Sequence, residues 1–197
     1  MSKVKFGPQT LVYPQPVFLI GADVDKKPNF LAVAWGGVAC GSPPMVSVAI
    51  NHSRHTIKGI KQNMAFSLNV TPRNYAMETD YCGVMSGSKT DKTVDCSFKV
   101  FYGDLVGAPM IEQYPVNLEC KVVHTLDLGS HYLVIGEIME THVSADCLTD
   151  GRPDMAKIQP IAYITGQPGG YYCMGETVGR AFRIGRELKK KRGLNSY

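Results

Sequence analysis

A chain of 197 residues, 44% of them hydrophobic, is long enough to bury a core and too apolar for a disordered protein. Its 20 glycines and 12 prolines are scattered between apolar runs, which is typical of turns between many short elements and favours a β-rich fold. The net charge of +4 is concentrated near the end, because residues 180–192 hold seven Arg or Lys and one Glu. The remaining body is slightly acidic, which argues against a general nucleic-acid surface there.

The sequence contains no apolar stretch long enough to span a bilayer, and residues 1–14 lack the apolar core of a signal peptide. We therefore expect a cytoplasmic protein with no membrane partner. The six cysteines lie far apart and form no C-x-x-C pair, so reduced and mostly buried thiols are expected. His124, His131 and His142 are seven and eleven residues apart, which fits no recognised zinc pattern, and no metal site is predicted.

The first third of the chain reads as strands. Residues 17–20 form a short apolar run that we expect to stop at Gly21, and the polar segment DVDKKPN then supplies a turn. Residues 30–35 are apolar again. Residues 45–50 alternate, with Val46, Val48 and Ile50 on one face.

The pattern changes to helical spacing after Ser53, where Ile57, Ile60, Lys61 and Met64 predict a short helix. Residues 66–70 restore the two-residue period and predict a strand. A second short helix is expected over 73–82. The small polar residues of 84–93 then form a loop that is a candidate ligand contact.

A long hairpin is predicted over 116–143, around a turn in which Gly129 can take a positive φ. Residues 161–164 form one more strand, and an amphipathic helix starting at Val178 runs into the basic tail, about 176–197. No repeat or linker divides the chain, so residues 1–197 read as one domain. Six or so strands with few helices and no regular βαβ alternation favour a barrel over a doubly wound sheet.

Several short motifs follow one another in a fixed order along the chain. They are PQPV at 14–17, PNFLAVAW at 28–35, PP at 43–44, SGSKTDK at 86–92, LEC at 118–120, GSH at 129–131 and GRPD at 151–154. In this order, from about residue 16 to 185, the sequence resembles the flavin reductase-like family and, within it, the flavoredoxins. The resemblance implies a mainly β, FMN-binding split β-barrel of the Greek-key type, with a few short peripheral helices and a C-terminal helix.

The family's cofactor, FMN, brings a dianionic phosphate, a polar ribityl chain and a flat ring, so its site needs cations, N–H donors and an apolar ledge. Ser53, Arg54 and Thr56 lie where a polar loop that begins at Asn51 leads into a helix, which suits a phosphate. Lys92 supplies a second cation, and Ser88 lies in the same small-residue loop. The alternative for this SRHT segment is an ordinary helix cap.

The resemblance places Asn29, Trp35 and His131 at the ring end, Asn29 through hydrogen bonds, Trp35 near the ring or ribityl chain and His131 near the ring. The alternatives are a core tryptophan and an exposed turn histidine. Ala32 stands where relatives have a hydroxyl, and Ile164 stands where flavoredoxins can place an aromatic residue. An aliphatic contact from Ile164 in place of stacking predicts a flavin that is held less tightly or exchanges more readily.

The resemblance implies an oxidoreductase that passes electrons from NADH, NADPH or a redox protein through FMN to free flavin or a partner. Such a reaction needs no protein nucleophile, so no catalytic residue is nominated. Two alternatives keep the FMN: a ferredoxin-linked electron carrier, and a flavin-binding module without turnover. A homodimer with FMN near the subunit boundary is also implied. The basic tail reads as a solvated helix end rather than a contact for nucleic acid or an acidic partner.

Overall fold

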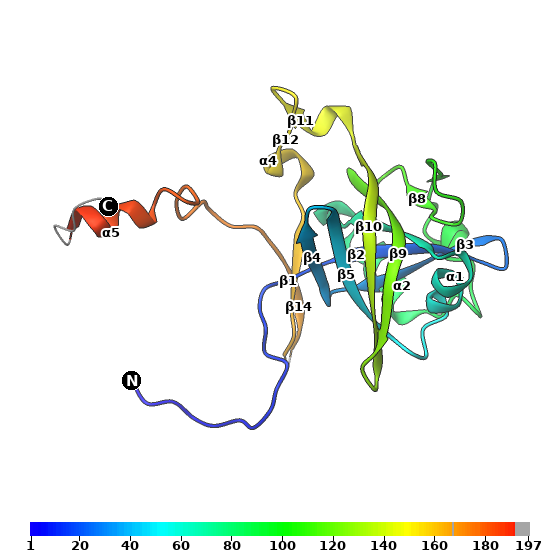
Figure 1. Cartoon of the computed structure of the whole chain (residues 1–197), viewed down its shortest axis with the longest axis horizontal. Helices are drawn as coiled ribbons and strands as arrows, with labels where there is room; N and C mark the ends of the chain where they lie inside the picture. The colour runs from blue at the N-terminus through cyan, green and yellow to red at the C-terminus, as the bar shows by residue number, and fades with distance from the viewer. Residues whose placement is uncertain (167, 192–197) are drawn as a thin grey trace.

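The computed structural model describes residues 1–166 and 168–191 and has the predicted mainly β architecture (Figure 1). Its centre is a seven-stranded antiparallel sheet in which the β9–β10 hairpin is inserted between β6 and β5. The strand order across this sheet is β3 (Lys27–Val33), β2 (Phe18–Val24), β6 (Ala65–Val70), β9 (Val116–Asp127), β10 (His131–Val143), β5 (Pro44–Asn51) and β4 (Gly36–Gly41).

The sheet curls into a split β-barrel, and its two edge strands, β3 and β4, are consecutive in the chain. The chain leaves β3, bends at Ala34 and Trp35, and enters β4 at the opposite edge. At the bend, the backbone N–H of Ala49 on β5 donates to the carbonyl of Trp35 at 2.7 Å. Alternate residues of β5 point into the barrel, and Val46, Val48 and Ile50 are buried there as predicted.

The strand predicted over 17–20 does not stop at Gly21. β2 continues to Val24, and the turn lies at Asp25 and Lys26, which both have positive φ. Gly21 is required by packing rather than by a turn, because a Cβ there would lie 2.7 Å from the ring of Phe30 and closer still to the carbonyl of Pro109. The other predicted strands and the hairpin turn are confirmed, including the positive φ of Gly129.

The described residues form five short α-helices: α1 (Thr56–Asn63), α2 (Ala76–Val84), α3 (Lys92–Asp95), α4 (Met155–Ile158) and α5 (Gly185–Lys191), of which α5 lies on an arm away from the barrel. The 3-10 turns η1 (Arg73–Tyr75) and η2 (Ala145–Cys147) precede α2 and β11. Helix α1 buries Ile57 and Ile60 in the barrel core. Cys82 of α2 joins a second core cluster with Phe30 and Tyr114. Both helices lie where the predicted ones were expected.

Three small sheets complete the fold. One joins β1 (Gln15–Pro16), β13 (Ile161–Ile164) and β14 (Gly170–Cys173), another joins β7 (Val100–Phe101) to β8 (Met110–Ile111), and the third joins β11 (Leu148–Thr149) to β12 (Arg152–Pro153). Among the described residues, no helix has the length and hydropathy needed to cross a membrane.

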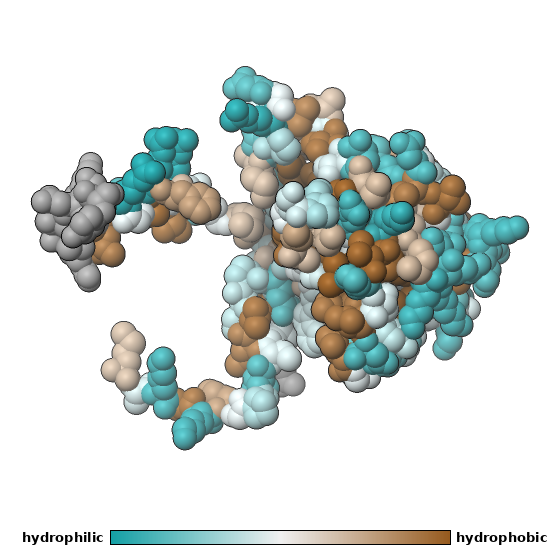
Figure 2. Space-filling view, in the orientation of Figure 1, coloured by the Kyte–Doolittle hydropathy of each residue, from teal (hydrophilic) through white to brown (hydrophobic). Residues whose placement is uncertain are grey.

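Both ends of the chain leave the barrel as extended arms (Figure 1). The predicted helix start at Val178 is wrong, because helix begins only at Gly185, and residues 192–197 of the basic tail lie outside the described residues. Val178 and Phe182 are almost fully exposed and have no surface to pack against, while Gly179 disfavours a helix between them. Apolar side chains lie along both arms in Figure 2.

Candidate functional site

A tight turn connects β5 to α1 and holds the predicted phosphate-binding residues. The Oδ1 atom of Asn51 accepts hydrogen bonds from the backbone N–H of Ser53 at 3.0 Å and from its hydroxyl at 2.7 Å, an arrangement that reverses the chain. His55 is the N-cap residue of α1, and its side chain makes no capping hydrogen bond to the first turn of the helix. The helix-cap interpretation of this segment therefore fails, and Ser53 and Thr56 are held by other contacts.

Thr56 is fixed from the neighbouring strand. The Nδ2 atom of buried Asn29 on β3 donates to Thr56 Oγ1 at 2.6 Å. Because the threonine oxygen accepts this bond, its own hydrogen stays available to donate to a ligand. Asn29 is itself held by close packing against Gly87, where a Cβ would lie 2.7 Å from Asn29 Cγ.

Lys92 places a buried cation beside this turn. Asp91 caps α3 by accepting bonds from the backbone N–H groups of Thr93 and Val94, which sets Lys92 at the first position of the helix. Lys92 is only 4% exposed, and its ammonium donates at 2.7 Å to the carbonyls of Phe30 and Cys82. Burial lowers the pKa of Lys92. Two of its three N–H donors are used, so one is left for a ligand.

These groups line a cavity of about 210 Å³ at the amino end of α1. The Arg54 side chain lines it too, and its Nη1 donates to the carbonyl of Gly83 at 3.0 Å. The other guanidinium N–H groups do not take part in that bond and can donate to a ligand. Two cations, three hydroxyls and the positive end of a helix dipole make this cavity suitable for an anion such as a phosphate. Its lining residues are Leu31, Ser53, Arg54, His55, Thr56, Met85, Ser86, Gly87 and Lys92.

A second cavity, of about 170 Å³, continues along β3 and β5 toward the aromatic residues. The rings of Trp35 and His131 lie 4.9 Å apart between centroids, at an interplanar angle of 33°. His131 opens β10 opposite Asn51 of β5, and its Nδ1 is 2.8 Å from the hydroxyl of Ser130. Trp35 is 42% exposed, so it is not a core residue.

Leu31 and Arg54 line both cavities, which therefore form one elongated site. One end offers cations and hydroxyls, and the other offers an aromatic pair and the aliphatic residues 31–34. A flavin mononucleotide has the same order of chemistry, because a dianionic phosphate is joined by a polar chain to a flat apolar ring. The donor set of the site therefore fits FMN.

A model of the family described as the flavin reductase like domain matches residues 10–169. The chain belongs to this family. The flavin reductase-like chain is similar to flavoredoxin from Methanosarcina acetivorans, with a TM-score of 0.90 and 38% identity over 95% of this chain and 100% of that one. It is also similar to flavoredoxin of Desulfovibrio vulgaris, with a TM-score of 0.87 and 35% identity over 93% and 100%. An uncharacterised Archaeoglobus fulgidus protein is 34% identical over 73% of this chain and 80% of its own length.

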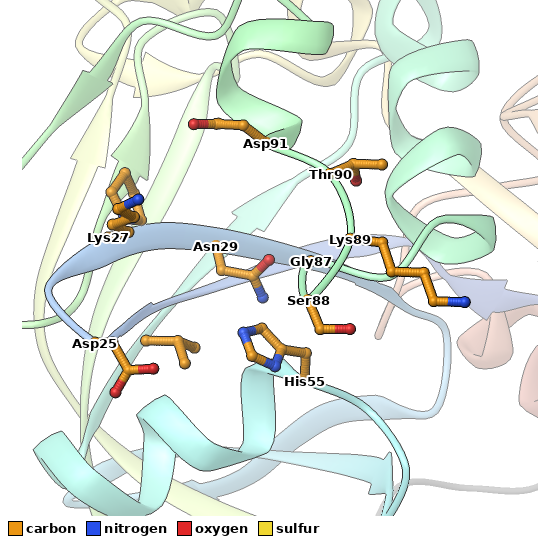
Figure 3. A pocket seen from close by; sticks show the side chains of 11 residues that line it. Asp25, Lys27, Asn29, His55, Gly87, Ser88, Lys89, Thr90 and Asp91 are labelled. Carbon is orange, nitrogen blue, oxygen red and sulfur yellow. The ribbon is translucent and has the colours of Figure 1, made fainter.

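In this flavin reductase-like chain, seven of the ten residues nominated from sequence line the elongated site: Trp35, Asn51, Ser53, Arg54, Thr56, Lys92 and His131. Asn29 was expected at the ring end but lies beside Thr56. Asn29 lies near the start of β3, whereas Trp35 follows the end of that strand. Asn29 and Ser88 line an adjoining cavity instead (Figure 3).

Ile164 lies on β13 in the separate three-stranded sheet and is not among the residues that line either part of the elongated site. Sequence reasoning missed Leu31, His55, Ser86 and Gly87. His55 is part of the same SRHT segment, and Ser86 and Gly87 start the SGSKTDK motif, so a signal for all three was present. Within the described residues, no three His, Cys, Asp or Glu side chains form a candidate metal cluster.

Proposed function

We propose that this protein binds FMN in the elongated site and transfers electrons through it, as an oxidoreductase of the flavin reductase and flavoredoxin type. The observation that supports this most strongly is the continuity of the two cavities through Leu31 and Arg54. An anion site alone would fit many phosphorylated ligands. An anion site joined to a partly exposed aromatic pair fits a flat ring attached to a phosphate.

At the phosphate end, the proposal assigns charge neutralisation to Arg54 and Lys92. Both cations are oriented by bonds to backbone carbonyls, which reduces the entropy lost when a ligand binds. The Thr56 hydroxyl, whose oxygen already accepts from Asn29, is set to donate to a phosphate oxygen.

At the ring end, FMN would supply the redox chemistry, since its ring accepts a hydride or single electrons. The protein's part is positioning. Trp35 is partly exposed beside the ring cavity and would leave one face of a bound ring accessible to a donor. His131 is oriented by Ser130 and lies where it can hydrogen-bond the ring or help place the donor.

Reduction of the FMN-loaded protein distinguishes the candidate donors. Under anaerobic conditions, bleaching of the flavin absorbance by NADH or NADPH is the result expected for a flavin reductase. Stoichiometric reduction by ferredoxin but not by NAD(P)H would support the electron-carrier alternative. Tight FMN binding with no reduction by any of these donors would leave a binding module and overturn the oxidoreductase proposal.

We also propose a homodimer with the flavin near the subunit boundary. The two extended arms expose apolar side chains that the chain's own barrel does not cover, among them Phe6, Val12, Val178 and Phe182. Burying these residues against a second copy would remove apolar surface from water. Light scattering at a concentration where FMN stays bound is expected to give twice the monomer mass, and a monomeric mass would contradict the proposal.

A further inference from the structure

The turn between β9 and β10 is tied to the turn between β5 and α1. The β9–β10 turn forms the lower tip of the barrel in Figure 1 and leads into His131, the histidine of the ring end. His131 pairs with Asn51 at the end of the ladder between β10 and β5. Immediately beyond this pair, the backbone N–H of His52 donates to the carbonyl of Ser130 at 3.3 Å. The two turns therefore meet where the ring end of the site begins.

The His52 side chain makes two further contacts with the β9–β10 hairpin. Its Nε2 lies 3.1 Å from Oδ1 of Asp127, the last residue of β9. Its ring lies against the ring of Tyr132, with 4.1 Å between the centroids and an interplanar angle of 37°. The same Asp127 oxygen accepts a hydrogen bond from the backbone N–H of Gly129 at 3.0 Å, which shapes the turn. One carboxylate oxygen thus joins the turn to His52.

Helix α1 contacts the same tyrosine. The Lys61 ammonium, in the last turn of α1, lies 3.4 Å from the centroid of the Tyr132 ring in a cation–π contact. Tyr132 also packs against the barrel core. Lys61, Tyr132, His52 and Asp127 therefore form one continuous network, the hairpin clamp, which joins α1 and the β5–α1 turn to the β9–β10 hairpin.

The hairpin clamp lies where the position of His131 is decided. The His131 ring contacts Trp35, which is itself partly exposed, and the hydroxyl of Ser130, which belongs to the turn. The end of a hairpin frays easily unless contacts at its tip hold it. Each contact of the clamp is partly solvent-exposed and weak by itself, but together they restrain a single turn. The orientation of His131 toward the ring cavity therefore depends on the clamp.

We propose that His52 and Asp127 are positioning residues that hold His131 against a bound flavin ring; this inference rests on the proposed flavin-binding function. Neither His52 nor Asp127 is among the residues that line the elongated site, so both act on the flavin through the β9–β10 turn. Loss of the hairpin clamp lets this turn move, and His131 then spends less time in the orientation that contacts the ring.

The hairpin clamp is expected to affect binding of the ring and not binding of the phosphate. Asn51 Oδ1 holds Ser53, the carbonyl of Gly83 holds Arg54, and neither contact uses the His52 side chain. FMN and riboflavin share the ring and differ in the phosphate. Removal of the clamp should therefore weaken both ligands alike.

Isothermal titration of the flavin-free full-length protein with FMN and with riboflavin tests this inference. His52→Ala is expected to weaken binding of both ligands about three- to tenfold, the range for one lost ion pair together with one lost aromatic contact. His124→Ala is the matched control, because His124 is an exposed histidine on β9 that lines neither cavity. Its affinities should stay within about twofold of those of the native protein.

Two further variants separate positioning from a general loss of stability. An asparagine side chain keeps an oxygen that can accept from Gly129 and from His52, so Asp127→Asn should bind both ligands within about twofold of the native protein. Asp127→Ala should instead resemble His52→Ala. Because His52 acts through His131, the loss caused by His52→Ala should largely disappear in the His131→Ala background.

Four results, each sufficient, would overturn the inference. They are unchanged affinities in His52→Ala, a loss confined to FMN, an equal loss in the His131→Ala background, and an Asp127→Asn variant as weak as Asp127→Ala. In each of these cases the native protein still binds FMN, so the proposed function survives. Failure of the native protein to bind either ligand would instead refute the proposed function, and this inference with it.

Discussion

The contact between Gly87 and Asn29 connects the stability of the fold to the phosphate end of the site. In Gly87→Ala, the new Cβ would lie 2.7 Å from Cγ and 3.2 Å from Nδ2 of Asn29, and closer still to Oδ1. Asn29 is 6% exposed and bonded to Thr56, so its side chain cannot move aside freely. The amide is then pushed away from Thr56, and the remaining overlap strains the packing of the loop from 85 to 91 against β3.

The cost of Gly87→Ala follows from these two responses. Overpacking of a buried contact costs about 1–3 kcal/mol. Loss of the bond between Asn29 and Thr56 adds about 0.5–1.5 kcal/mol. We therefore expect the free energy of unfolding to fall by about 2–4 kcal/mol. With a urea m-value of about 2 kcal/mol/M, the urea midpoint falls by about 1–2 M.

Urea unfolding followed by the fluorescence of the single tryptophan measures this loss. Gly37→Ala is the matched control, because a Cβ at Gly37 has no heavy atom within 4 Å and its midpoint should change little. The double variant Asn29→Ala/Gly87→Ala removes the clashing amide, so Gly87→Ala should cost at least 1 kcal/mol less in that background. Equal cost in both backgrounds would refute the clash as the cause.

Three further predictions concern single residues of the site. Arg54→Ala should weaken FMN binding about 10- to 100-fold, because a charge-assisted hydrogen bond to the phosphate is lost. Riboflavin binding should change much less, because riboflavin has no phosphate. Equal losses of FMN and riboflavin affinity in calorimetric titrations would refute this role. Trp35→Ala should weaken FMN and riboflavin about equally, by about three- to tenfold, and a loss confined to FMN would place Trp35 away from the ring. Burial lowers the pKa of His55 in the folded state, so below pH of about 6.5 the unfolded chain protonates His55 more readily than the folded chain does. The free energy of unfolding should therefore fall as the pH decreases below about 6.5. In His55→Gln that part of the pH dependence of urea midpoints should disappear, and an unchanged profile would exclude His55 as its source.

The sequence predicted most of the central strands because their side chains alternate or form bounded apolar runs. The β9–β10 hairpin was evident from two such runs around a glycine with positive φ. β4 was missed, because its residues Gly36–Gly41 combine three glycines with small or exposed side chains and have no clear period. The helix start at Val178 was misplaced for the opposite reason, since a local apolar period carries no information about whether a partner surface exists.

Seven of the residues nominated from the motif order line one cavity system, but the motif order did not indicate their hydrogen-bond partners. That Asn29 bonds Thr56, 27 residues later, depends on how β3 packs against α1, and no local pattern encodes that packing. The same holds for Lys92, whose burial depends on carbonyls of β3 and α2. Long-range contacts of this kind decide which end of a ligand each residue meets.

A crystal structure of the protein with FMN tests the central claim most directly. The account predicts the phosphate among Ser53, Arg54, Thr56 and Lys92, and the ring beside Trp35 and His131. A flavin bound elsewhere, or bound in this site with its ring at the Lys92 end, would contradict it.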